Sequence, residues 1–443
     1  MILVEGFRKA KPLLTREIPF GFSLTSPESK DKTRKEELSP EQTVRHIIAE
    51  VYDKGDKALF SYTKKLDGVE LSSLEITQDE ISAAYKKVDK KLVSALKLAA
   101  DRIDKFHSTC KQKLELSFLS HGLGRQVNPL DKVGIYVPGG TAAYPSTVLM
   151  TAIPARVAGV KEIIVATPPQ EDGAVSAPTL VAADIARVNR LFKIGGAQAI
   201  AALAFGTESV PRVDKICGPG NIFVVLAKKI VYGVVDIESL PGPSEVVIVA
   251  DDTANASFCA ADLLAQAEHD PAASAILITT SSKLAGDVDS EIKLQLAKLE
   301  RQAIAAKSIN SKGMIVLVDN MDEAVELVNL YAPEHVSLMV RNASTYAQRI
   351  HNAGCIFIGN GSPVVLGDYI AGPSHVLPTG GSARFSSPLG IEDFFKVTNI
   401  IALDETQGKE LGPSAIAIAE AEGLKGHAQA IKLRLQATEE RLR

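Results

Sequence analysis

A regular alternation of short apolar runs with helical stretches constrains this chain more than any other feature. Strands that alternate with helices predict parallel, doubly wound sheets. The pattern begins near residue 131 and resumes after residue 251, so the chain is expected to contain two α/β units. The runs expected to form strands are 133–137, 162–166, 190–194, 215–217, 245–249, 275–279, 313–318, 336–340 and 355–358.

The first part of the chain follows a helical pattern instead. Ser39-Pro40-Glu41-Gln42 combines an N-cap serine, a proline at the first helical position and a glutamine at the N3 position. Thr77-Gln78-Asp79-Glu80 repeats this capping box, and residues 90–114 have the pattern of a long amphipathic helix. The first box precedes an apolar helical face made by Val44, Ile47, Ile48 and Val51. A charged, turn-rich segment at 26–37 looks peripheral.

Composition removes several classes of protein. Of the 443 residues, 46% are hydrophobic and 23% are charged, which excludes a disordered chain or a disulfide-stapled miniprotein. The net charge of -4 argues against a nucleic-acid partner, and no apolar run approaches the roughly 20 residues that span a bilayer. The first residues lack a signal-peptide pattern. Four widely spaced cysteines without a C-x-x-C pair suit a reduced, cytoplasmic protein.

Three glycine-rich turns follow expected strands of the first α/β unit. Ligands of open α/β sheets bind beyond the carboxyl ends of strands, and glycine lets the backbone approach a phosphate. None of the turns completes G-x-G-x-x-G, and Thr167-Pro168-Pro169 offers no acid for a ribose, so they are either ordinary turns or an unconventional nucleotide site. They are Pro138-Gly139-Gly140, Gly195-Gly196-Ala197-Gln198 and Gly218-Pro219-Gly220-Asn221.

Two short polar motifs carry candidate chemistry in the second α/β unit. Gln266 and His269 share one helix face and are able to reach one ion, although such a histidine is also typical of a helix C-terminus or a core. Glu334 and His335 leave a helix after Pro333 and point in different directions. They are either surface polar residues or a carboxylate and an imidazole that serve two neighbouring positions.

The remaining candidates lie in irregular segments near the C-terminus. Residues 359–389 are rich in Gly, Pro and Ser and also contain Asp368 and His375; such a long irregular segment is usually functional. Glu422 and His427 flank a helix break at Gly423. Two imidazoles, one carboxylate and one amide would suit zinc or a similar divalent ion, but sequence spacing alone does not show that they converge.

Taken together, these motifs resemble the histidinol dehydrogenase family along essentially the whole chain. The blocks that carry the resemblance are 134–140, 218–221, 242–245, 265–269, 333–335, 375–381 and 421–424, with His427 close behind the last of them. The resemblance implies oxidation of L-histidinol to L-histidine, the last step of histidine biosynthesis, by two NAD in succession with histidinaldehyde as the intermediate.

The resemblance also implies a role for each matching residue. Glu334 and His335 would be the catalytic acid/base pair. Zinc, one ion per site, would be held by Gln266, His269, Asp368 and His427. NAD would be contacted by Tyr136, Gln198 and Asn221. Substrate would be contacted by Ser244, Gln266, His269, His335, Asp368, His375, Glu422 and His427.

The implied architecture has two incomplete Rossmann-like domains, an N-terminal helical domain and a C-terminal helical tail. The first Rossmann-like domain would comprise residues 1–29 and 115–245 and bind NAD, with the helical domain at 30–114. The second would comprise residues 246–388 and carry the metal and catalytic residues, and the tail at 389–443 would complete the site of a partner in a homodimer. The remaining alternatives are a dehydrogenase of another small alcohol, a zinc hydrolase in which Glu334 activates water, and a non-catalytic binding protein.

Overall fold

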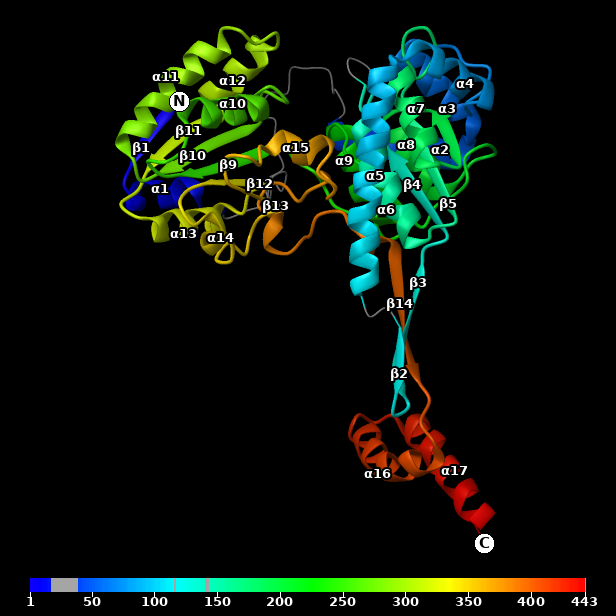
Figure 1. Ribbon diagram of the computed structural model, residues 1–443. Coiled ribbons are helices and arrows are strands. Elements are labelled where there is room, and N and C mark those ends of the chain that lie inside the picture. The colour runs from blue at the N-terminus through cyan, green and yellow to red at the C-terminus, as the bar shows by residue number, and fades with distance from the viewer. Residues whose placement is uncertain (17–38, 115–116, 140–142, 443) are drawn as a thin grey trace, which may run out of the picture. The chain divides into compact units, whose positions relative to one another are not determined.

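The computed structural model of the chain describes residues 1–16, 39–114, 117–139 and 143–442 (Figure 1). These residues divide into two compact units, one of residues 1–112 and 130–394 and the other of residues 113–129 and 395–443. The first unit contains two parallel sheets with helices on their faces, and the second ends in two helices. The predicted α/β class, with its C-terminal helical tail, is confirmed.

The first sheet has five parallel strands in the order β6-β5-β4-β7-β8. Its core is filled on one face by the apolar sides of α8 and α9, while α6 and α7 pack against one another and α6 contacts β4 and β5. The bounds are β4 (Lys132–Tyr136), α6 (Pro145–Ala158), β5 (Glu162–Thr167), α7 (Ala177–Ala186), β6 (Arg190–Lys193), α8 (Gly196–Phe205), β7 (Lys215–Cys217), α9 (Ile222–Val231) and β8 (Asp236–Ile237).

The helical segment before this sheet contributes to the same core. Both predicted capping boxes are present, at Ser39 and at Thr77, and the four apolar residues predicted on one face of α2 are buried together with side chains of α8 and α9. Residues 17–38, and with them the segment at 26–37, lie outside the described residues. The bounds are α2 (Pro40–Lys54), α3 (Asp56–Tyr62), the π-helix η1 (Thr63–Asp67), α4 (Gln78–Lys87) and α5 (Lys90–Lys113).

The second sheet has six parallel strands in the order β1-β11-β10-β9-β12-β13. Figure 1 shows α10, α11 and α12 on one face and α1, α13 and α14 on the other, and each set of helices shares an apolar core with the sheet. The strands are β1 (Ile2–Glu5), β9 (Glu245–Ala250), β10 (Ser274–Thr279), β11 (Met314–Leu317), β12 (His335–Met339) and β13 (Cys355–Ile358). The helices are α1 (Phe7–Leu14), α10 (Ala256–Ala267), α11 (Ser282–Leu296), α12 (Gln302–Lys312), α13 (Met321–Tyr331) and α14 (Ala343–Ala347).

Two boundaries differ from the sequence prediction. Residues 1–29 were assigned to the first sheet, yet β1 pairs in parallel with β11 at the edge of the second. The strand at 245–249, which continues the first alternation in sequence, lies between β10 and β12 in the middle of the second sheet. Sequence order cannot reveal such exchanges, because an edge strand recruited from the N-terminus has the same apolar pattern in either sheet.

The second unit contains three antiparallel strands that the sequence did not predict. The strands β2 (Phe118–Ser120), β3 (Leu123–Pro129) and β14 (Phe395–Ile401) pair in the order β14-β3-β2. The sequence places residues 115–129 in the first Rossmann-like domain and 389–443 in the C-terminal tail, whereas here strands from both segments pair with each other. The strands escape prediction because they are largely exposed and lack the apolar alternation of a half-buried strand.

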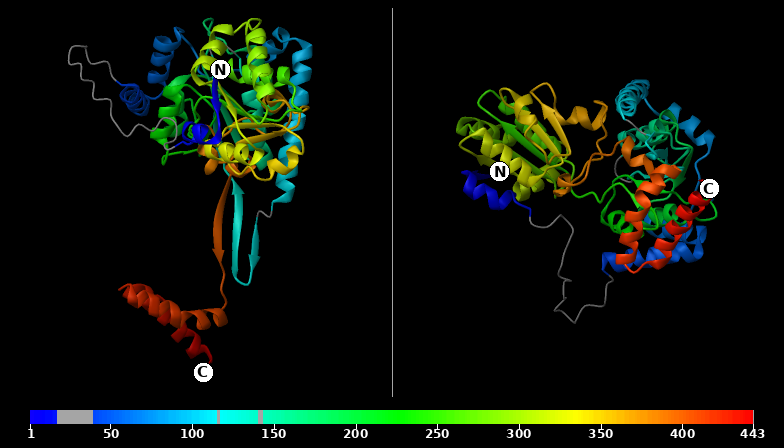
Figure 2. Two further views of the ribbon diagram at one scale, coloured as in Figure 1. Left: turned by 90° about the vertical axis from the view of Figure 1, so that its left-hand side faces the viewer. Right: turned by 90° about the horizontal axis from the view of Figure 1, so that it is seen from below.

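Two helices complete the second unit. They are α16 (Glu405–Ala421) and α17 (Lys425–Leu442), and Figure 2 shows them as a pair that follows β14. The predicted break at Gly423 is present, and this glycine has a left-handed φ of 76°. The tail helix begins at Glu405, where Asp404 and Gln407 form a third capping box.

Candidate active site

The predicted acid/base pair lies at the amino end of the second sheet, where β9 and β12 begin. Glu334 and His335 are 7% and 4% exposed, so they are not the surface residues that the sequence left as an alternative. His335 is the first residue of β12, and its partner in the register of β9 is Val246, next to Glu245. The pair is therefore carried by the start of β12, whose backbone is fixed by pairing with β9 on one side and β13 on the other.

The main chain of Glu245 holds both members of the pair. Its N–H donates to Oε2 of Glu334 at 2.8 Å, and its carbonyl oxygen lies 3.1 Å from Nδ1 of His335. Since a carbonyl only accepts, Nδ1 of His335 carries the hydrogen and Nε2 is left with a lone pair in the neutral ring. Nε2 has no hydrogen-bond partner among the described residues and lies 3.5 Å from Oδ1 of Asp368.

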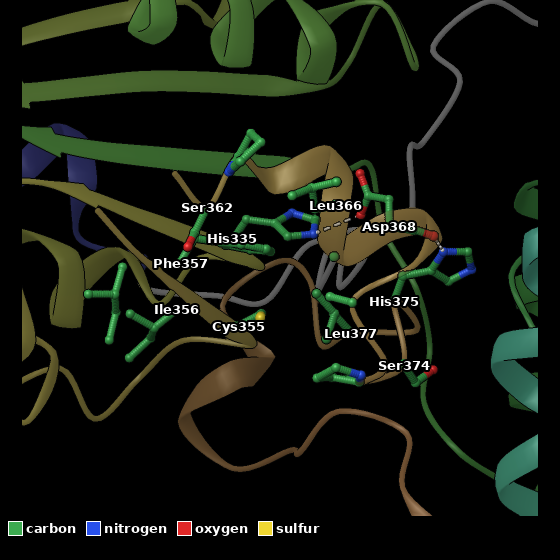
Figure 3. Close-up of a pocket in the computed structure, with 15 residues that line it drawn as sticks. His335, Cys355, Ile356, Phe357, Ser362, Leu366, Asp368, Ser374, His375 and Leu377 are labelled. Atoms are coloured by element: carbon green, nitrogen blue, oxygen red, sulfur yellow. Dashed lines mark hydrogen bonds and ion pairs between the residues drawn. The ribbon is translucent and has the colours of Figure 1, made fainter. Parts of the chain in front are cut away.

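Asp368 and His375 face this pair from the irregular segment that follows β13. Asp368 lies on the short helix α15 (Val364–Tyr369), and its carbonyl oxygen accepts from Nδ1 of His375 at 2.7 Å. Figure 3 shows the side chains of His335 and Asp368 pointing toward one another. The segment is anchored on the other side by Ser374, whose hydroxyl donates to the carbonyl oxygen of Met150 at 3.0 Å.

Burial and neighbouring charge shift the pKa values of these groups in opposite directions. Burial raises the pKa of Glu334 to about 7, against the attraction of His335. Burial would lower the pKa of His335, but Glu334 and Asp368 more than offset it and raise that pKa to about 9. Burial would raise the pKa of Asp368, yet His335, His375 and His269 hold it below its ordinary value. The site is thus an electrostatically coupled cluster of carboxylates and imidazoles.

A pocket of about 360 Å³ opens beside this cluster. Its walls are mainly apolar, from β13 and the segment around α15, and its polar groups are those of His335, Asp368, Ser374 and His375 (Figure 3). An apolar pocket with a few convergent polar groups of shifted pKa is typical of a small-molecule site.

Three of the four predicted metal ligands lie in the first unit. Gln266 is buried near the end of α10, and one end of its amide finds no hydrogen-bond partner among the described residues. His269 lies just beyond that helix, is exposed, and is close enough to lower the pKa of Asp368. These donor types fit a divalent ion, because an imidazole and a carboxylate interact electrostatically and the nearby helix α10 carries a buried amide with one unsatisfied atom.

The predicted metal ligands do not all lie in one unit. The described residues contain no group of three or more histidine, cysteine, aspartate or glutamate side chains placed to hold an ion. The fourth predicted ligand, His427, lies exposed on α17, and Glu422 lies exposed at the end of α16, both in the second unit. Ser244, the remaining predicted substrate contact, is half-buried beside Glu245, and its carbonyl accepts from Ser274.

The residues predicted to contact NAD gather at the carboxyl end of the first sheet. The Tyr136 hydroxyl accepts from the backbone N–H of Gly196 at 3.0 Å, and Oε1 of Gln198 is buried without a partner among the described residues. Asn221 caps α9 by accepting from Phe223 and Val224. Three turns meet here, although Gly140 of the first lies outside the described residues.

These turns require glycine because they approach other backbone closely. A Cβ on Gly218 would lie 2.0 Å from the carbonyl oxygen of Tyr136, and Cβ atoms on Gly139 and Gly195 would both collide with Pro168. Beneath Gly218, the buried Lys228 pairs with Glu238 at 2.7 Å and also donates to the Gly218 carbonyl at 3.1 Å. The three turns are therefore packed closely against neighbouring backbone and side chains and are not separate surface loops.

Sequence reasoning missed two residues of the site. Glu245 appeared only as the start of a strand, and Arg16 carried no signal at all, although Arg16 forms an ion pair with the Glu245 carboxylate. No motif could have found Arg16, because its partner lies more than two hundred positions away in sequence.

Comparison with known proteins identifies the family of this chain. The histidinol dehydrogenase family model matches residues 30–435. The chain belongs to the histidinol dehydrogenase family. A histidinol dehydrogenase from Dehalococcoides mccartyi strain CBDB1 is 52% identical over 437 residues, covering 98% of this chain and all of the relative. One from Clostridium acetobutylicum is 52% identical over 409 residues, covering 92% and 95%.

A solved structure supports the same membership. The crystal structure of histidinol dehydrogenase from Elizabethkingia anophelis superposes with a TM-score of 0.90 at 35% identity and covers 99% of both chains. Members of the histidinol dehydrogenase family are oxidoreductases, and so is this chain. Among the described residues, no helix is both long and apolar enough to cross a membrane.

Proposed function

We propose that this chain oxidises L-histidinol to L-histidine through histidinaldehyde, as the final step of histidine biosynthesis in the cytoplasm. The observation that carries the proposal is the buried His335, which lines an apolar pocket together with Asp368 and has the buried Glu334 next to it. One imidazole and one carboxylate match the two kinds of proton transfer that an alcohol and then a hydrated aldehyde require.

The proposed groups that assist this chemistry are NAD and one zinc ion. When bound, NAD accepts one hydride in each of the two oxidations, and a zinc ion at Gln266, His269 and Asp368 supplies Lewis acidity and a positive charge that draws the pKa of neighbouring His335 downward. Tyr136, Gln198 and Asn221 hold the dinucleotide in the proposal, since they stand at or beyond the carboxyl ends of the strands, where α8 and α9 begin with N–H groups that favour a phosphate.

In the first oxidation, His335 acts as the base. Its Nδ1–H donates to the Glu245 carbonyl, so the lone pair of Nε2 faces the pocket and takes the hydroxyl proton of histidinol. As that proton leaves, the carbon–hydrogen bond yields its electron pair as hydride and the carbon becomes an aldehyde. The orientation of the ring is fixed by β12 and by the Glu245 carbonyl, so little reorganisation is needed.

In the second oxidation, Glu334 acts as the base toward water. Its Oε2 is held by the Glu245 N–H, which leaves Oε1 to accept a proton from the water that adds to the aldehyde. The hydrate then loses a second hydride and a proton to give the carboxylic acid. A carboxyl whose pKa is raised to about 7 is a better base than an exposed one, because basicity rises with pKa.

We further propose a homodimer in which the tail of each chain completes the partner's site. Glu422 and His427 are exposed at the ends of α16 and α17, as ligands offered to another molecule would be. Refolding an equal mixture of Asp368→Ala and His427→Ala chains tests this. About half of the dimers should be mixed and one site in each should be intact, which returns about a quarter of wild-type activity. No recovery, with mixed dimers shown to form, would reject shared sites.

The central test counts NADH formed from limiting histidinol. We expect two NADH per histidinol with little free aldehyde, because the pair Glu334–His335 provides a base for each oxidation at one site. One NADH per histidinol with accumulating aldehyde would reject the two-step mechanism. Reduction of NAD by another small alcohol but not by histidinol would assign a different substrate, and no reduction at all would reject the dehydrogenase.

A further inference from the structure

Arg16 lies just beyond α1 and contacts the two chain segments that carry the proposed catalytic pair. Its guanidinium pairs with Oε1 of Glu245 at 2.5 Å and lies over the ring of Tyr331 with its central carbon 3.8 Å from the ring centre. Both partners are more than nine-tenths buried. One cation therefore ties the start of β9 to the end of α13.

The first segment, at Glu245, positions both catalytic groups through its main chain. Its N–H binds the Glu334 carboxylate and its carbonyl binds the His335 ring. The two groups lie in successive peptide planes that meet at the Cα of Glu245, so a displacement of that Cα moves both hydrogen bonds together. The Glu245 side chain extends from the same Cα, and Arg16 is its ion-pair partner.

The second segment leads from Tyr331 directly into the catalytic pair. Ala332 has a left-handed φ of 52°, which is uncommon for a residue with a Cβ, and Pro333 follows before Glu334. A strained backbone of this kind persists only when its surroundings hold it. Stacking of Arg16 on Tyr331 immobilises the residue before the strained turn, and the turn in turn sets the direction of the Glu334 side chain.

We propose that Arg16 is a positioning residue for the reaction, acting through Glu245 and Tyr331 to hold Glu334 and His335 in register. Arginine suits this task because its planar group pairs with a carboxylate at its edge and stacks on an aromatic ring with its face. The proposal rests on the proposed function, since it assigns Arg16 a part in both oxidations. Loss of Arg16 should slow both oxidations together, whereas loss of Glu334 or His335 should slow one oxidation more than the other.

The test compares Arg16→Met with Lys11→Met in histidinol-driven and histidinaldehyde-driven NAD reduction. Lys11 is the matched control: it also joins α1 to α13, through an ion pair with Glu326 at 2.8 Å, but both side chains are about half exposed. We expect Arg16→Met to lower kcat about 10- to 100-fold with either substrate, the usual loss when a group supporting a catalytic residue is removed. KM for NAD and the kcat of Lys11→Met should be unchanged.

Two further variants separate positioning from folding. Arg16→Lys keeps the charge without the planar stack and should recover part of the lost kcat. Glu245→Gln should lower kcat as Arg16→Met does, and the double variant should cost no more than the worse single one, since both act through one contact. Wild-type kcat per folded molecule in Arg16→Met, or losses that simply add in the double variant, would overturn the proposal.

The same assays distinguish failure of the proposed role of Arg16 from failure of the proposed histidinol oxidation. If the wild-type chain reduces NAD with histidinol but Arg16→Met does so equally well, the inference alone is wrong. If the wild-type chain does not reduce NAD with histidinol, the proposed function is wrong and the role of Arg16 falls with it. A loss confined to one of the two oxidations would assign Arg16 to a single catalytic group and contradict the joint positioning.

Discussion

The two parallel sheets of the first unit use opposite edges. In the five-stranded sheet the proposed NAD contacts lie beyond the carboxyl ends of the strands, after β4 and β7 and at the start of α8. In the six-stranded sheet the catalytic residues lie at the amino ends, where β9, β12 and β13 begin. The usual rule, that open α/β sheets bind ligands at carboxyl ends, holds for only one of them.

Helix direction explains why each edge suits its chemistry. At the carboxyl edge of the first sheet, α8 and α9 begin, and their free N–H groups favour phosphate. At the amino edge of the second sheet, α10 and α13 end, and the partial negative charge of a helix C-terminus favours cations. The proposed dinucleotide would therefore suit the helix N-termini at the first edge, and the proposed metal ion and amine-bearing substrate would suit the helix C-termini at the second.

The two edges also differ in what they are made of. The first is built from backbone and glycine, with charge buried beneath it in Lys228–Glu238. The second is built from ionisable side chains that face a pocket. Substitutions that add atoms should therefore disturb the carboxyl edge of the first sheet. Substitutions that remove a proton acceptor should disturb catalysis at the amino edge of the second sheet.

The largest expected effect is at the catalytic pair. His335→Asn should slow alcohol oxidation about 10²–10⁴-fold and affect aldehyde oxidation less, while Glu334→Gln should do the reverse, because each removes one proton acceptor and roughly keeps its shape. Rates with histidinol and with histidinaldehyde measure both. Equal losses on the two substrates would show that the residues do not divide the work, and unchanged circular dichroism serves as the control for folding.

The next effect is on stability at the other edge. Lys228→Met leaves the Glu238 carboxylate buried and unpaired, so the free energy of unfolding should fall by about 3–5 kcal/mol. Denaturant titration measures it, with the exposed pair Lys64–Glu70 as comparison: Lys64→Met should change stability by about 0–1 kcal/mol. Equal losses of unfolding free energy in the two variants would mean that burial of the Lys228–Glu238 pair does not increase its contribution to stability.

A smaller effect is expected from one added methyl group. Gly218→Ala places a Cβ against the Tyr136 carbonyl, which should cost about 1–3 kcal/mol beyond backbone strain and raise KM for NAD. Gly233→Ala is the matched control, since Gly233 has a similar φ of 100° but open space around it. If both variants lose the same stability and keep the same KM for NAD, the close approach at Gly218 is not what the turn requires.

The smallest effect concerns a second buried histidine, His107 on α5, which has no catalytic role in this proposal. Burial lowers its pKa to about 4, whereas in the unfolded chain it is near 6.5. The unfolded state therefore binds more protons between these values, and stability is lost as pH falls from 6.5 toward 4.

The variant His107→Leu isolates the contribution of His107 to the pH dependence of the free energy of unfolding. Lowering the pH from 7 to 5 should reduce the contribution of His107 to the free energy of unfolding by about 2 kcal/mol, a loss that the leucine variant escapes. Parallel denaturant titrations at the two pH values measure the difference. An identical acid sensitivity in both chains would contradict the lowered pKa of His107, in which burial outweighs the opposing attraction of Asp104.

Local patterns determined a large part of this fold before any coordinates. The capping boxes at Ser39 and Thr77, the apolar face of α2, the break at Gly423 and, within a residue or two, every strand of the two parallel sheets except β1 and β8 follow from contacts within a few residues. The exposed strands β2, β3 and β14 escaped prediction because their pairing involves distant segments and buries little apolar surface.

The residue types of the site were equally visible in sequence, since carboxylates, imidazoles and glycine turns stand out at their spacings. Only the tertiary structure decided which residues they contact and which edge of each sheet they occupy. The main chain of Glu245 binds both Glu334 and His335, and Arg16, far away in sequence, pairs with the Glu245 side chain. Periodicity reports which face of an element is buried, but the partner across a contact is chosen by chain topology, which no local pattern records.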